Sequence, residues 1–121
     1  MESTRVLIAY ESRLARQLVR TIVSSYEDFE VIGEIEDESR IVPTIEQSPA
    51  DFLIVEQGAP GQRPAICERV LARWPRMRIL AVASGSEQST LYWVSTEIRS
   101  VPVETCEEGV INALRGKIGS C

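Results

Sequence analysis

The sequence predicts an α/β fold of three layers, in which helices cover both faces of a parallel β-sheet. Short runs of apolar residues recur along the chain, and stretches with apolar residues at three- and four-residue steps separate them. This pattern is typical of alternating strands and helices. The length of 121 residues, without an internal repeat or a low-complexity tract, favours a single domain over residues 1–121.

The first half of the chain predicts three strands with two helices between them. The strands cover 5–9, 29–35 and 52–55; the third is an unbroken apolar run, which suits a strand buried on both faces. Residues 29–35 alternate between apolar and polar, so we expect that strand at a sheet edge. Ser12 and Asp37 can cap the two helices, and Pro43 should keep the second helix short or kinked.

The second half predicts that the alternation continues. We expect helices over 64–74, 87–95 and 107–114, and strands over 77–83 and 98–103. Pro102 has no N–H to donate, which places the last strand at an edge or the proline at a strand end. Five parallel strands with right-handed crossovers result, and the flavodoxin-like order 2-1-3-4-5 is the natural expectation.

In that order, the first and third strands flank the point where the connections of the sheet change direction. Tyr10 and Glu11 follow the first strand, and Glu56 ends the third. These side chains should therefore meet at the carboxyl edge, where open α/β sheets bind ligands. The segment 58–61 reads GAPG, which lacks the glycine spacing of a P-loop or a dinucleotide site and predicts a turn.

Charge and composition exclude several classes of function. The net charge of −5 provides no diffuse basic field for nucleic acid or an anionic membrane. The chain has no histidine, which excludes Ser-His and Cys-His nucleophile pairs. No apolar run approaches the roughly 20 residues that span a bilayer, and the first strand leaves no room for a signal peptide, so we expect a cytoplasmic protein.

The three cysteines, Cys67, Cys106 and Cys121, lack CxxC spacing. An odd number of cysteines without that spacing favours reduced thiols.

Several segments carry a family resemblance in the right order: RVLIAYE, FEVIGEIEDESRIV, PADFLIVEQGAPG and ARWPRMRILAVAS. They resemble the CheY-like receiver domain of bacterial two-component response regulators over nearly the whole chain, most closely the receivers of LuxR/NarL-type regulators. The resemblance implies a signalling domain of a phosphorelay, which works through protein contacts and is not an enzyme.

The residues that correspond to the acidic pocket of that family differ from its usual pattern. The aspartate pair that holds Mg²⁺ corresponds to Tyr10 and Glu11, and the phosphoacceptor aspartate corresponds to Glu56. The residue whose carbonyl also binds the metal corresponds to Gly58. A divalent cation needs several oxygen ligands, and Glu11 and Glu56 supply too few of them. We therefore expect no metal cofactor, or at most weak binding of a divalent cation.

The positions that correspond to the family's switch residues differ as well. The hydroxyl residue after strand 4 falls on Ala83, with Ser84 one place later, and the lysine of strand 5 falls on Val101. Ile98 replaces the switching aromatic residue, and no lysine precedes Lys117. Phosphoryl transfer needs in-line placement, a cation and a lysine on the equatorial oxygens. We therefore expect a degenerate receiver, or pseudo-receiver, that is not phosphorylated.

Alternatives stay open at this point. Glu56 can mimic the phosphorylated state or act as a structural carboxylate bonded by Tyr10 or backbone amides. Leu91, Tyr92 and Trp93, next to Ile98 and Val101, can form an interface in the helix 4, strand 5, helix 5 region, used for a protein partner or a homodimer, or can belong to the core. A divergent phosphorylatable regulator and a small-molecule sensor are the alternative functions.

Overall fold

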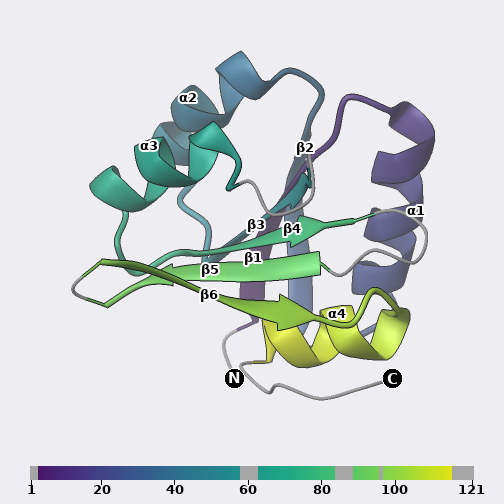
Figure 1. The fold of residues 1–121 in the computed structure, drawn as a ribbon. Coiled ribbons are helices and arrows are strands. Elements are labelled where there is room, and N and C mark those ends of the chain that lie inside the picture. The colour runs from purple at the N-terminus through teal and green to yellow at the C-terminus, as the bar shows by residue number, and fades with distance from the viewer. Residues whose placement is uncertain (1–2, 58–62, 84–88, 96, 116–121) are drawn as a thin grey trace.

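The fold is a sheet of six strands with helices on both faces (Figure 1). We describe it from a computed structural model, which describes residues 3–57, 63–83, 89–95 and 97–115. The strand order is β2-β1-β3-β4-β5-β6. The first four strands in this order pair in parallel, whereas β5 pairs antiparallel with both β4 and β6.

The four parallel strands and their helices agree closely with the sequence patterns. The strands are β1 (Thr4–Ala9), β2 (Phe29–Ile35), β3 (Phe52–Glu56) and β4 (Arg78–Val82). Their helices are α1 (Arg13–Ser24), a 3-10 turn η1 (Glu38–Arg40), α2 (Ile41–Gln47) and α3 (Ala65–Arg73). The remaining elements are β5 (Ser89–Val94), β6 (Ile98–Val103) and α4 (Glu107–Leu114).

The helices start where the sequence offers caps. The Ser12 hydroxyl accepts a hydrogen bond from the amide of Ala15, and the Asp37 carboxylate accepts one from the amide of Ser39. Each cap satisfies a donor that the first turn leaves without an intrahelical partner. Pro43 lies at the third residue of α2, which has only seven residues, so the expectation of a short helix is confirmed.

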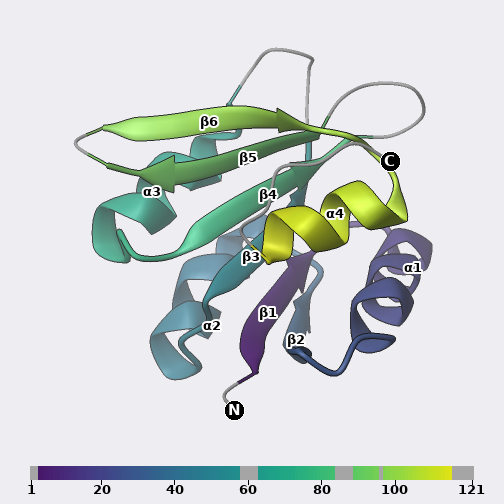
Figure 2. The same ribbon diagram turned by 90° about the horizontal axis from the view of Figure 1, so that it is seen from below.

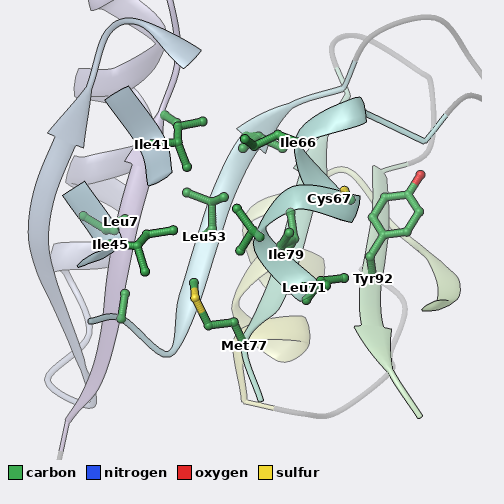
Figure 3. Packing of buried hydrophobic residues seen from close by; sticks show 14 of the residues in the cluster. Leu7, Ile41, Ile45, Leu53, Ile66, Cys67, Leu71, Met77, Ile79 and Tyr92 are labelled. Carbon is green, nitrogen blue, oxygen red and sulfur yellow. The ribbon is translucent and has the colours of Figure 1, made fainter. Parts of the chain in front are cut away.

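Two apolar cores lie on opposite faces of the sheet (Figures 1 and 2). Helices α2 and α3 cover one face, where Leu7, Leu53 and Ile79 are fully buried beneath Ile45 and Leu71 (Figure 3). Helices α1 and α4 cover the other face. Residues of β1 and β3 alternate between these cores, which is the side-chain period of a strand.

The prediction of a helix over 87–95 is wrong. Residues 84–88 lie outside the described part. Residues Ser89–Val94 form the strand β5, which pairs with β4 so that Leu91 lies opposite Leu80 and Thr90 lies opposite Ala81. Thr90, Tyr92, Trp93 and Val94 are β-branched or aromatic and favour a strand. The expected sheet of five parallel strands is therefore a mixed sheet of six, although the order of its first four strands is as expected.

The outer strand β6 forms an antiparallel hairpin with β5. Pro102 lies opposite Thr90, and the amide of Ser95 donates to the carbonyl of Glu97 across the turn. Hydrogen-bonded and non-bonded pairs alternate in such a ladder. Counted from the bonded pair of Ser95 and Glu97, the pair of Thr90 and Pro102 is a non-bonded one, so the nitrogen of Pro102 faces the free edge of the sheet. The expectation that Pro102 marks an edge strand is confirmed.

The cysteines differ from one another. Cys67 is a free thiol buried in α3, and burial raises its pKa to about 12. Cys106 is disulfide-bonded, so the expectation of three reduced thiols is wrong at this position, and Cys121 lies outside the described residues. None of the described helices is both long and apolar enough to cross a bilayer.

Candidate functional site

The candidate site lies where β1 and β3 end side by side. In the sheet register Ala9 lies beside Val55, so Tyr10 and Glu56 are the next neighbours along the two strands. Side chains alternate between the faces of a sheet, and Ala9 and Val55 belong to the core under α2 and α3. Tyr10 and Glu56 therefore point toward the face that carries α1 and α4.

Tyr10 is a buried phenol beside an exposed carboxylate. The residue is only 6% exposed and packs in the core under α1 and α4, whereas Glu56 and Glu11 are exposed. Burial, with the nearby charge of Glu56, raises the pKa of Tyr10 well above its usual range. Both effects disfavour a phenolate, so Tyr10 stays protonated at physiological pH.

Arg16 supports the backbone of the site from the first turns of α1. One of its guanidinium nitrogens donates to the carbonyls of Tyr10, at 2.7 Å, and of Glu11, at 3.0 Å. Its Nε lies 3.8 Å from a carboxylate oxygen of Glu34, and its side chain is 12% exposed. A charged donor on two carbonyls fixes the turn after β1. The guanidinium group of Arg16 is therefore already engaged with the protein and is not available to bind a ligand.

A cavity of about 1420 Å³ opens at this edge of the sheet. Its walls come from the ends of β1, β2 and β3, from η1 and α2, and from the start of α3. Tyr10, Glu11 and Glu56 all line it, so the expected meeting of these three residues holds. The cavity also extends over Glu36 and Arg40, which the sequence patterns did not indicate as site residues.

The structure separates the other expected positions from this group. Val101 lies on β6, with the whole of β5 between it and β4, and neighbouring strands lie roughly 4.8 Å apart. Ile98 is at the far end of β6, in a pair with Val94. Val101, which corresponds to the family's lysine, therefore lies away from Tyr10 and Glu56, because an extra strand separates β6 from β4. Gly58 and Ser84 lie outside the described residues.

Ala83 lies at the end of β4 in a different environment. It is 6% exposed, and its amide donates to the hydroxyl of Ser89 at 2.9 Å. That hydroxyl lies 2.7 Å from the hydroxyl of Thr105, and Ser89 has no exposed surface. This cluster joins β4, β5 and the segment before α4. No sequence signal singled out Ser89, since its role depends on an antiparallel strand that the patterns did not predict.

The aromatic stretch of β5 divides between core and surface. Leu91 and Tyr92 are 2% and 6% exposed and belong to opposite cores, so the core interpretation holds for both; the ring of Tyr92 packs beside α3 (Figure 3). Trp93 is half-buried on the side of α4, in a pair with Arg99. The region expected as helix 4, strand 5 and helix 5 contains β5, β6 and α4 among the described residues.

Glu11 and Glu56 are the carboxylates that could hold a cation at the ends of β1 and β3. Within the described residues, no group of three or more acidic or cysteine side chains is placed to bind a metal ion. The tyrosine beside them presents a neutral hydroxyl, which is a poor ligand for a hard cation.

Comparisons with solved structures identify the fold. The chain is similar to the signal receiver domain of a Mycobacterium tuberculosis protein described as the response regulator NarL, with a TM-score of 0.61 and 23% identity over 72% of this chain and 71% of that one. It is also similar to the isolated receiver (REC) domain of RcsB from Salmonella enterica serovar Typhimurium, with a TM-score of 0.60 and 19% identity. That match covers 71% of this chain and 65% of the other.

A longer Salmonella typhimurium RcsB chain matches with a TM-score of 0.62 and 20% identity; the match covers 71% of this chain but only 45% of RcsB. No family model and no curated protein matches the sequence. The molecule therefore has the CheY-like fold of response-regulator receiver domains. At these identities the likeness extends to the fold, and the chemistry has to be argued from the chain's own residues.

Proposed function

We propose that this chain is a pseudo-receiver, a signalling module that works by protein contacts in the cytoplasm and is not switched by aspartyl phosphorylation. The observation that carries the proposal is that Glu56 and Tyr10 lie next to the paired residues Val55 and Ala9, at the ends of β3 and β1, and line the same cavity. A glutamate and a protonated phenol stand where the resemblance implies two aspartates. The receiver fold supports the signalling role.

The chemistry of phosphoryl transfer argues against a phosphorylated state. The extra methylene of Glu56 moves its carboxylate by more than the roughly 1 Å that can cost about 100-fold in rate. The buried ring of Tyr10 occupies the position of a metal ligand, so Mg²⁺ loses a carboxylate. The family's lysine on the equatorial oxygens has no counterpart, because the chain has no lysine before Lys117, and Arg16 is engaged with two carbonyls and Glu34.

The proposal includes a protein partner, which can be a second copy of the chain. The surface that we assign to it is formed by β5, β6 and α4, where Trp93 and Val101 are half-buried on the side of α4. Aromatic side chains that keep part of their surface are enriched at protein interfaces. Sedimentation velocity of the chain with Trp93→Ala and Val101→Ser as variants tests the homodimer.

Treatment with acetyl phosphate and Mg²⁺, followed by intact mass spectrometry, tests the missing phosphorylation. We expect no mass increase of one phosphoryl group. The Glu56→Gln variant is the matched control, because it keeps the size of the side chain and removes the nucleophile. An adduct on the native chain that disappears in this variant would establish the alternative, a divergent phosphorylatable regulator. An adduct on Ser84 would do the same.

A second candidate, a sensor of small molecules, rests on the cavity at the carboxyl edge, which Tyr10 lines. A thermal-shift screen of metabolites, repeated with Tyr10→Phe, separates this candidate from a pure protein-contact module, because only a sensor gives a specific shift.

A further inference from the structure

The outward face of α1 leaves two large apolar side chains in solvent. Leu14 is 77% exposed and Leu18 is 62% exposed, and no other large apolar side chain among the described residues is as exposed as these two. Residues four positions apart are neighbours on the surface of a helix, so the two leucines form one apolar stripe. Val19 and Val23 hold the opposite side of α1 against the core. The fold therefore uses one side of this helix and leaves the leucine stripe exposed.

The same helix carries a charge opposite to that of the chain. The helix α1 contains three arginines and no acidic residue, whereas the whole chain has a net charge of −5. Arg16 and Arg20 share one carboxylate, that of Glu34, and Arg13 has no ion pair within the described part of the chain. A groove of about 460 Å³ is lined by these arginines and by Glu34. Positive charge is therefore in excess beside the leucine stripe.

Neither the exposed leucines nor the first arginine adds to the stability of the helix. Arg13 is the first residue of α1, and the first turn contains no acidic residue, although the helix dipole favours negative charge at this end. Exposed leucines bury little apolar surface, so a polar helix former at either position would serve the fold as well. Residues that break a local rule without a gain for the fold are expected at functional sites.

Charge selects among the possible occupants of this face. A second copy of α1 packed on the leucine stripe would bring the arginines of the two helices together, and like charges repel each other. An anionic membrane would repel the acidic remainder of a chain whose net charge is −5. An acidic helix meets neither obstacle, because its carboxylates can pair with the arginines while its apolar side covers the leucines.

We propose that the outward face of α1 docks an amphipathic helix of a partner protein. The apolar stripe of that helix covers Leu14 and Leu18, and its acidic flank pairs with Arg13 and Arg20. The helix α1 lies on the outside of the molecule, beside β2 (Figure 2), where a second helix can pack along it. The inference extends the proposed protein-contact function to a second surface, which is separate from that of β5, β6 and α4 and does not depend on the chemistry at Glu56.

Titration calorimetry of the full chain with three synthetic helical peptides tests the proposal. The first peptide has leucines at three- and four-residue steps and glutamates on both sides of the leucine stripe. The second has lysines in place of the glutamates, and the third has serines in place of the leucines. We expect saturable binding of the first peptide only, which weakens as the salt concentration rises. Amide shifts in NMR should place that peptide on α1.

Variants of α1 separate the apolar contribution from the charged one. The double variant Leu14→Gln with Leu18→Gln keeps helix propensity and should weaken binding of the first peptide by at least about tenfold. Its thermal unfolding should match that of the native chain, because both leucines are exposed, and Leu14→Gln alone should give part of the loss. Arg13→Gln should weaken binding about threefold.

The matched control for the charge is Arg69→Gln. Arg69 is exposed on α3, on the other face of the sheet, and the variant makes the same change in net charge as Arg13→Gln. Its affinity for the first peptide should equal that of the native chain. Equal weakening by the two arginine variants, or unchanged affinity in the leucine variants, would overturn the inference.

The other possible occupants of the face give different results. A dimer of the native chain that the leucine variants dissociate in sedimentation velocity would make the face an interface between two copies. Binding to vesicles of phosphatidylserine and phosphatidylcholine, without binding of the first peptide, would make it a membrane-binding face. Either result refutes the inference. A phosphoryl adduct on Glu56 refutes the pseudo-receiver and leaves this inference standing, whereas failure of the first peptide to bind refutes only the docking face.

Discussion

The parallel half of the sheet and the hairpin of β5 and β6 are held by different means. The strands β2, β1, β3 and β4 pair with one another in parallel, and β1, β3 and β4 contain runs of buried residues. The hairpin is joined by local antiparallel pairing, and in β6 the residues before the buried Val103 are half-buried or exposed. The comparison teaches that the carboxyl-edge site depends on the parallel half alone, whereas the hairpin sets the shape of the outer surface.

Truncating one buried side chain in each region tests this difference, and we expect the largest effect here. Leu53→Ala in β3 removes a side chain with no exposed surface and should lower the free energy of unfolding by about 3 kcal/mol. Val101→Ala in β6 removes a half-buried side chain and should cost about 1 kcal/mol. Urea unfolding measures both, and equal losses would contradict the comparison.

Two glycines, one in β2 of the parallel half and one in α4 outside it, give the next largest effect. A Cβ at Gly109 in α4 would overlap the carbonyl oxygen of Glu104, whereas a Cβ at Gly33 in β2 would lie 3.1 Å from Cδ2 of Leu7. A backbone carbonyl cannot move as easily as the end of a leucine. We therefore expect Gly109→Ala to lower stability by about 2 kcal/mol and Gly33→Ala to lower it by clearly less, as measured by thermal unfolding.

The hydroxyl of Ser89 connects the two regions, because it accepts a hydrogen bond from the amide of Ala83. Ser89→Ala leaves a buried donor unsatisfied and should cost about 1 to 2 kcal/mol. Ser100→Ala is the control, since Ser100 is exposed on β6, and it should change stability by less than about 0.5 kcal/mol. If both variants lose the same stability, the cluster at Ser89 does not tie the hairpin to the parallel half.

The smallest effect concerns the ion pair of Asp28 and Arg115, which joins the residue before β2 to the C-terminal end of α4. Arg115 donates two hydrogen bonds to Asp28, at 2.8 and 3.1 Å, and these hold the pKa of Asp28 below its usual range. A lowered pKa in the folded state stabilises the fold above the unfolded pKa, and this stability is lost as the pH falls through the folded value.

The melting temperature of the native chain should therefore fall more steeply below about pH 4 than that of Arg115→Gln. Both residues are exposed, so the difference should be small and should shrink in high salt. If the melting temperatures of the native chain and of Arg115→Gln change with pH in the same way, the ion pair contributes nothing to stability.

The sequence predicted the parallel half and the centre of the site because both depend on local patterns. The apolar run before Glu56 predicted a buried strand, and the strand order placed that residue beside Tyr10. The hairpin was missed because residues 89–94 were interpreted from their expected position after β4, although Thr90, Tyr92, Trp93 and Val94 favour a strand. That error also misplaced Val101. The role of Arg16 depends on contacts with carbonyls, which no side-chain pattern reveals.

The position of Pro102 has a consequence for how this chain behaves at high concentration. A free sheet edge can act as a template on which further chains add strand after strand, up to fibrils. The ring nitrogen of Pro102 removes one donor from that edge, and exposed Arg99 adds a charge beside it. The outer strand thus presents an edge with one donor fewer and a charge beside it, which disfavours the addition of a strand from another molecule.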